Sequence, residues 1–191
     1  MSIPAVEGAI LLTSSSRLAR WLQYQYGELQ KKEGSKCWST PEIFSLTNWL
    51  ATIWRQSWPN LHILSHLQST KLWETIIQGD LHLSKPNLLH LRGTAVRAAE
   101  AYKFIQQYQL STEPSIFRWT HESETFHRWL KQFENRLNEW RALDLASLPD
   151  LVKEGIQTKR IPLPECRLIF AGFDEITPQL LSLLEFLQSN N

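Results

Sequence analysis

The sequence has few cysteines, no long apolar run and no recognisable targeting segment. Cys37 and Cys166 are its only two cysteines, and they lie far apart without the CxxC spacing of zinc motifs. We therefore expect neither a zinc site nor a disulfide scaffold. The longest apolar runs fall far short of a membrane span, and the N-terminus lacks the pattern of a signal peptide. These absences predict a cytoplasmic protein without a membrane anchor.

A bias of charge is also missing. The chain has 20 lysines and arginines against 19 aspartates and glutamates, which gives a formal net charge of +1. This balance excludes the overall basic character that drives nonspecific binding to nucleic acid. Any contact with nucleic acid must therefore be local, or must be made with help from another domain.

Tryptophan, in contrast, is abundant. The 191 residues include nine tryptophans, and 42% of the residues are hydrophobic, enough for one good core or two small ones. Tryptophan stacks well on unpaired bases, but most of these residues fall on the apolar faces of expected helices. We therefore expect most of them to fill the space between helices.

The N-terminal residues predict a strand, a loop and a helix. Gly8–Leu12 is a short apolar run, and Thr13–Ser16 is a cluster of hydroxyl residues that favours a helix N-cap. Apolar residues then recur at steps of three and four from Leu18 to Leu29, which predicts a helix that ends near Gly34.

Helices should dominate the middle of the chain. A brief extended segment is expected at Lys36–Pro41, and the helix after it should end at Pro59. Over residues 61–157 the strand signals disappear, and four apolar stripes at helical spacing predict four helices. The second of these should start after Ser84 and Pro86.

The most informative stretch lies near the C-terminus. Cys166–Ala171 reads as a strand buried on both faces, and Thr177–Pro178 as the N-cap and first residue of a helix. Asp174 and Glu175 fall at the carboxyl end of this strand, where open α/β sheets place their ligands. This turn is therefore the expected working edge of the molecule.

The order of the expected elements predicts the architecture. Strand–helix units at both ends, with a block of helices between them, indicate an α/β and predominantly helical fold with a small parallel sheet. Residues 1–60 should form the first part of the α/β domain, residues 61–160 a helical insertion, and residues 161–191 the return to the sheet.

The loop after the first expected strand is a candidate phosphate site. Phosphate-binding loops use glycines to wrap the backbone around the ligand and a lysine to reach its terminal phosphates. Thr13–Ser16 contains neither, so only the hydroxyls and the helix N-terminus remain to attract an anion. Arg17 and Arg20 lie in the first helical turn, where the helix dipole mildly disfavours cations. Either an anion is held there, or two exposed arginines carry a small cost.

The other candidate sites are weaker. Asp174 and Glu175 could form a Walker B-like pair that binds Mg²⁺, but without a phosphate loop a capping turn is the favoured interpretation. His62 and His66 could share a helix face, yet no third ligand accompanies them, which favours surface histidines. Neither cysteine has a nucleophile motif. We expect no catalytic residue and no metal site.

Four motifs together resemble a known group. Ile10–Arg20, Trp38–Pro41, Asn48–Leu50 and Ala171–Gln179, with the helical middle around Phe126–Trp129, are similar in order and spacing to the N-terminal part of bacterial AddB/RecB-like probable DNA repair proteins. The match extends over nearly the whole chain.

The resemblance implies an inactivated superfamily-one helicase module. Its fold would be of the P-loop NTPase type, with motor domain 1A and a helical 1B insertion. In such proteins further helicase-like domains and a C-terminal PD-(D/E)XK nuclease follow, and the whole processes DNA ends. This chain lacks the nuclease pattern, and Ala171 stands where related proteins tend to carry an acidic residue. The implied site positions are a degenerate phosphate loop and a Walker B-like turn: Thr13, Ser14, Ser15, Ser16, Arg17 and Arg20, and Gly172, Phe173, Asp174 and Glu175.

Two functions of different classes follow. The first is a noncatalytic helicase-like domain of a DNA repair protein, without ATP or Mg²⁺ as cofactor. Its expected partners are DNA, the remaining helicase-like and nuclease domains of a longer parent, and a helicase subunit. The second is a helical protein-interaction module with no direct role on DNA. A nucleotide-dependent enzyme ranks last, although a full-length parent would carry exonuclease activity.

Overall fold

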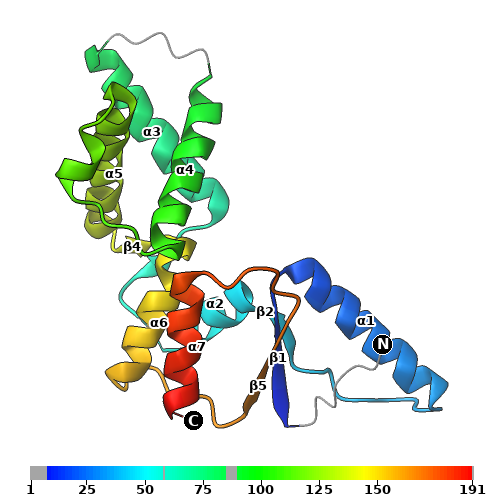
Figure 1. Ribbon diagram of the computed structural model, residues 1–191. Coiled ribbons are helices and arrows are strands. Elements are labelled where there is room, and N and C mark those ends of the chain that lie inside the picture. The colour runs from blue at the N-terminus through cyan, green and yellow to red at the C-terminus, as the bar shows by residue number, and fades with distance from the viewer. Residues whose placement is uncertain (1–7, 58, 85–89, 191) are drawn as a thin grey trace.

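Three short parallel strands hold the two ends of the chain together. The structure is a computed structural model that describes residues 8–57, 59–84 and 90–190, and over these residues the fold is α/β and mostly helical (Figure 1). The sheet has the order β2-β1-β5, with the strands β1 (Ala9–Thr13), β2 (Ile43–Ser45) and β5 (Arg167–Ala171). Both outer strands run parallel to β1, so the predicted small parallel sheet is confirmed.

One of the three strands lies outside its predicted position. The brief extended segment expected at Lys36–Pro41 has no regular structure, and β2 follows Pro41 instead. The prediction was wrong because it took Pro41 as the end of the segment. Proline also favours an extended residue before it and disturbs no ladder when it precedes a strand.

Helices cover both faces of the sheet. Successive strand residues point to opposite faces, so Leu11 packs against α1 and Leu12 against the helices on the other side. The four helices are α1 (Ser16–Lys32) on one face, and α2 (Leu46–Gln56), α6 (Leu148–Gln157) and α7 (Pro178–Asn190) on the other (Figure 1). Thr177 caps α7, since its Oγ1 accepts from the Leu180 amide at 3.4 Å, as the sequence predicts.

Strand β5 is less buried than the sequence suggests. Its residues are exposed or half-buried, whereas Leu11 and Leu12 of β1 are buried. The expectation of a strand buried on both faces was wrong because β5 is an edge strand with β1 as its partner in the sheet. An apolar run alone does not distinguish a central strand from an edge strand.

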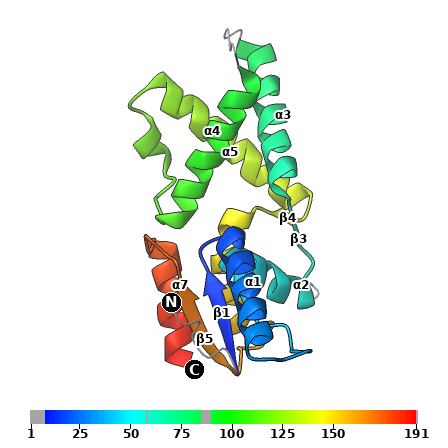
Figure 2. The same cartoon turned by 90° about the vertical axis from the view of Figure 1, so that its right-hand side faces the viewer.

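A helical part is inserted between α2 and α6. It contains α3 (His66–Ser84), α4 (Leu91–Gln107), the short 3-10 helix η1 (Pro114–Phe117) and α5 (His121–Glu139). Trp73, Tyr102 and Phe133 meet at the centre of its core. Both views show this helical part stacked on the α/β part (Figures 1 and 2). The expected start of the second helix, after Pro86, lies outside the described residues.

Two very short strands connect the parts. β3 (His62–Ile63) and β4 (Ala142–Leu143) pair in parallel where the chain enters and leaves the helical part. The sequence prediction that residues 61–157 contain no strand was therefore wrong, because two-residue strands leave no periodic signal. His62 lies in β3 and His66 begins α3, so they do not share a helix.

Polar contacts reinforce this connection. The 3-10 helix η2 (Leu145–Ser147) joins β4 to α6. Ser69 of α3 donates to Asp144 at 2.6 Å, the hydroxyls of Tyr102 and Ser147 lie 2.9 Å apart, and Gln179 of α7 donates to the Ala146 carbonyl at 2.9 Å. Side chains from both parts therefore hold the segment that links them.

Of the eight tryptophans that the structure describes, four are buried, Trp38 is half-buried and three are exposed, so fewer than expected pack between helices. Trp49, Trp54, Trp73 and Trp129 are buried, as expected for residues between helices. Exposed tryptophans are Trp21 at 47%, Trp119 at 86% and Trp140 at 50%. The exposed ones need a separate explanation, since packing does not account for them.

Candidate functional site

The carboxyl ends of the three strands form one edge of the sheet. Thr13, Ser45 and Ala171 are the last residues of β1, β2 and β5, and Thr13 pairs in register with each of the other two. α1 and α2 begin within three residues of these ends. The loop after β1 and the turn after β5 therefore lie together, as expected for an open parallel sheet.

The loop after β1 is very short. β1 ends at Thr13 and α1 begins at Ser16, which leaves two residues between them. The Ser14 amide donates to the Ala171 carbonyl at 3.3 Å, and the Ser15 hydroxyl accepts from the Leu18 amide at 3.3 Å. These protein contacts use amides that a phosphate cradle would turn toward its ligand. The loop is therefore a capped turn rather than a cradle.

The hydroxyls of this loop are also occupied by protein contacts. Thr13 is fully buried, and its hydroxyl donates to the carbonyls of Ser15 at 2.9 Å and Phe44 at 3.2 Å. Ser16 donates to the Ser45 hydroxyl at 3.1 Å. In phosphate-binding loops a hydroxyl at the start of the helix coordinates Mg²⁺. Here that hydroxyl ties α1 to the end of β2.

Two residues of this edge escaped the sequence analysis as site residues. Ser45 caps α2 by accepting from the Asn48 amide at 3.4 Å, and the Asn48 side chain donates to the Ser16 hydroxyl at 3.5 Å. A serine three residues before an asparagine, ahead of an apolar helical stripe, is a recognisable N-cap signal. Its proximity to Ser16 depends on the sheet order, which the sequence does not show.

Arg17 and Arg20 lie on the outside of α1. Both side chains are exposed, and the first turn of α1 contains no acidic residue. The helix dipole places partial positive charge at this end, and the two arginines add to it. The start of α1 is therefore a locally positive surface.

The turn after β5 packs closely against the start of α1. Gly172 has φ +74°, and a Cβ at this position would lie 2.3 Å from Cδ2 of Leu18 and 3.5 Å from Oγ of Ser14. Glycine is required here by the left-handed backbone and is favoured by the close approach. Phe173 folds back toward the strand, with its ring centre 6.1 Å from that of Phe170.

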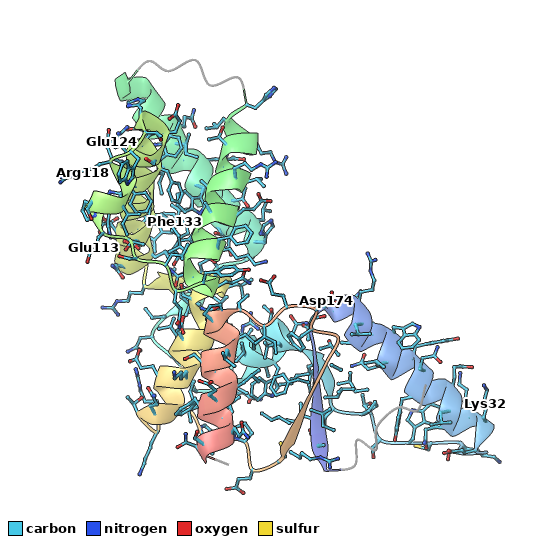
Figure 3. The ribbon with its side chains drawn as sticks, viewed as in Figure 1. Lys32, Glu113, Arg118, Glu124, Phe133 and Asp174 are labelled. Atoms are coloured by element: carbon cyan, nitrogen blue, oxygen red, sulfur yellow. The ribbon has the colours of Figure 1, made fainter. Side chains whose placement is uncertain are left out.

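The two carboxylates of this turn do not act as a pair. Glu175 accepts a hydrogen bond from the Tyr108 hydroxyl at the end of α4. This bond, together with the negative charge of Glu175, raises the pKa of Tyr108 above its ordinary value. Asp174 is exposed and lies in the turn above the strand ends, near the start of α1 (Figure 3). Glu175 therefore links the sheet part to the helical part.

The chemistry available at this edge is limited. Within the described ranges, no group of three His, Cys, Asp or Glu side chains is close enough to hold a metal ion. A surface hollow of about 400 Å³ lies near the other end of α2, lined by Trp54, Arg55, Pro59, Leu61, His62 and Ile63. It contains none of the predicted site residues. The edge offers hydroxyls, the exposed Arg17 and Arg20, the exposed Asp174, and Glu175, which is exposed but bonded to Tyr108.

Comparisons with known proteins give no family assignment. No protein-family model matches the sequence, and no curated protein matches it. Within the described part of the chain, no helix combines the length and apolar character needed to cross a membrane. The resemblance to AddB/RecB-like proteins therefore rests on the sequence motifs and stays a prediction.

Proposed function

We propose that this chain is a noncatalytic, helicase-like domain of a cytoplasmic DNA repair or recombination protein, which helps to bind or position DNA or a partner subunit. In this proposal the α/β part corresponds to a P-loop NTPase fold of the 1A type, and the helical part corresponds to a 1B-like insertion. The longer parent would contribute further helicase-like domains and a PD-(D/E)XK nuclease.

The observation that carries the proposal is the arrangement of the sheet edge. The loop after β1 and the turn after β5 meet there, as in a nucleotide-binding motor. The loop nevertheless has two residues between strand and helix, with no glycine and no lysine. A parallel sheet edge of this kind, without the glycines and the lysine of a phosphate-binding loop, supports a scaffold role rather than ATP turnover.

Nucleotide hydrolysis tests the noncatalytic part. The purified chain should show no Mg·ATP hydrolysis above the blank, with or without DNA, because the loop after β1 lacks the glycines and the lysine that hold phosphates. Hydrolysis that Ser16→Ala or Asp174→Ala abolishes, and that the surface control Ser39→Ala leaves unchanged, would overturn it.

DNA binding tests the rest of the proposal. Fluorescence anisotropy with a labelled forked DNA should show binding at low salt that weakens steeply as salt increases, since phosphate contacts release counterions. Absence of binding to any DNA at low salt would contradict the DNA role and favour the second candidate function.

The second candidate is a protein-interaction module. It is favoured by Trp119, which is 86% exposed although its loop is well anchored. Thr120 and Ser123 form a capping box at the start of α5, and Phe117 stacks on His127 with ring centres 4.8 Å apart. A large apolar side chain held outward between two anchors is typical of a protein contact.

A further inference from the structure

The outer face of α1 combines charge with exposed aromatic rings. α1 packs against the sheet through Ala19 and Leu22, which are buried. The opposite face of the helix presents side chains that are exposed to solvent: Arg17, Arg20, Trp21, Tyr24, Lys31 and Lys32. Trp21 and Tyr24 follow Arg17 by four and seven residues, Tyr24 follows Arg20 by four, and Lys31 follows Tyr24 by seven, so these side chains lie along one stripe. The same spacing places Glu28, the partner of Lys31, on this stripe.

The charge of the molecule is concentrated on this helix. α1 carries four of the 20 lysines and arginines of the chain but one of its 19 aspartates and glutamates. Its formal charge is therefore +3, whereas the remaining 16 basic and 18 acidic side chains give −2. Lys31 is paired with Glu28 at 2.9 Å. The near-neutral total of the protein thus hides the basic surface of α1.

The aromatic side chains on this stripe stand beside the arginines. Trp21 is 47% exposed and Tyr24 is 63% exposed. Trp21 follows Arg17 by four residues and Tyr24 follows Arg20 by four, which places each ring next to a cation on the helix surface. Rings that are flat, exposed and flanked by cations are suited to stacking on bases while the cations meet phosphates.

Trp119, the most exposed of the described tryptophans, has the opposite surroundings. In the sequence Trp119 follows Glu113 and precedes Glu122 and Glu124. Arg118 stands directly before it. Figure 3 shows Glu113, Arg118 and Glu124 on the outer side of the helical part, whereas Lys32 marks the far end of α1. Phosphates would be repelled near Trp119 and attracted along α1.

We propose that the outer face of α1 is a binding site for single-stranded nucleic acid, with Trp21 and Tyr24 stacking on unpaired bases and Arg17, Arg20 and Lys32 contacting phosphates. This inference rests on the proposed DNA role. It assigns that role to the outer face of α1, with single-stranded nucleic acid as the ligand. A helix of 17 residues spans roughly 25 Å, which accommodates several nucleotides. In duplex DNA the bases are stacked on one another, so their faces are not available to Trp21 and Tyr24.

The aromatic arm of the test uses anisotropy of a labelled oligothymidine of about 16 nucleotides, compared with a duplex of the same length. The wild-type chain should bind the single strand more tightly than the duplex. Trp21→Ala with Tyr24→Ala should weaken single-strand binding by about tenfold or more. The matched control is Trp119→Ala, which removes a more exposed ring from an acidic surface and should leave binding unchanged.

The charge arm uses the salt dependence of the same binding. Arg17→Glu with Arg20→Glu should reduce the slope of log K against log salt by about 1.4, since each phosphate contact on a single strand contributes about 0.7. Arg92→Glu with Lys103→Glu makes the same change of net charge on the exposed surface of α4 and should have a much smaller effect. Circular dichroism checks that every variant is folded.

The outcomes separate the inference from the proposed function. If both α1 double variants bind DNA as the wild type does, the inference is overturned but the DNA role stands. The outer face of α1 would then be a candidate surface for a protein partner. Equal affinity for duplex and single strand would overturn the inference as well. Failure of the wild-type chain to bind any DNA at low salt would overturn the inference and the DNA role together.

Discussion

The helical part and the α/β part of the molecule bury their apolar residues in different ways. The helical part closes around one core, in which the Trp73 ring stacks on Phe133 at 4.3 Å and on Phe126 at 6.2 Å, with Tyr102 at the edge. The α/β part divides its buried residues between the two faces of a three-stranded sheet. The helical part therefore has one continuous core, whereas the α/β part has two, one on each face of the sheet.

The sheet is incompletely covered at the edge formed by β5. β5 is half-buried, and Ile176 and Leu181, in the turn after it and in α7, are 55% and 46% exposed. A parallel sheet usually has both faces and its edges covered, because its backbone groups and apolar side chains need partners. The α/β part therefore leaves apolar side chains at this edge uncovered, which is compatible with the proposed scaffold role.

The largest effect is expected from breaking the core of the bundle. Trp73→Ala should lower the free energy of unfolding by about 3–5 kcal/mol, because it removes a fully buried ring and leaves a cavity between Phe133 and Phe126. Urea unfolding followed by circular dichroism measures the loss. Trp140→Ala, which removes a half-exposed ring, should change stability by less than about 0.5 kcal/mol. Similar losses in both variants would contradict the view of the bundle as a tightly packed unit.

A second effect is a loss of stability at high pH that arises in the helical part, from the titration of Tyr102. Burial raises the pKa of Tyr102 to about 12, from an ordinary value near 10. The neutral phenol is favoured in the folded protein, so its contribution to stability is complete below pH 10 and is lost as the pH rises from 10 to 12. The loss should be on the order of 2–3 kcal/mol.

The measurement compares unfolding of the wild type and of Tyr102→Phe between pH 9 and 12. Tyr102→Phe also removes the contact with Ser147 and should start about 1 kcal/mol less stable. The advantage of the wild type should then shrink as the pH rises. An advantage that stays constant to pH 12 would show that the Tyr102 hydroxyl is not shielded from water. Tyr24→Phe, on the exposed face of α1, controls for removal of a tyrosine hydroxyl.

Residue patterns predicted most of the helices and the central strand, because these elements have local causes. Apolar periodicity marks α5, the hydroxyl cluster after the first strand marks the cap of α1, and Thr177 with Pro178 marks the start of α7. The exceptions are the short strands. β2, β3 and β4 are too short for a periodic signal, and their pairing depends on strands far away in the sequence.

The candidate site was predictable in part. The sequence identified Thr13–Ser16 and the turn at Gly172, and strand order brings both to one edge. Two contacts were not predictable, because they join residues that are far apart in the sequence. Ser16 and Ser45 are 29 residues apart, and Tyr108 and Glu175 are 67 residues apart. The basic stripe of α1 was hidden by a net charge near zero, because the sum does not show where charges lie.

The smallest of the three effects comes from replacing one glycine in the α/β part and one in the helical part. Gly172→Ala should destabilise the protein by about 1–2 kcal/mol, because its backbone is left-handed and its Cβ would displace the Leu18 side chain. Gly79→Ala, an exposed position within α3 where a Cβ meets no atom within 4 Å, should instead stabilise it by about 0.5–1 kcal/mol. Thermal unfolding of the two variants measures both changes. Opposite signs are expected because the helix needs no glycine, whereas the turn after β5 cannot approach α1 without one. No cost for Gly172→Ala would remove the argument that the turn is fixed against the start of α1, and destabilisation by Gly79→Ala would contradict the open surroundings of that position in α3.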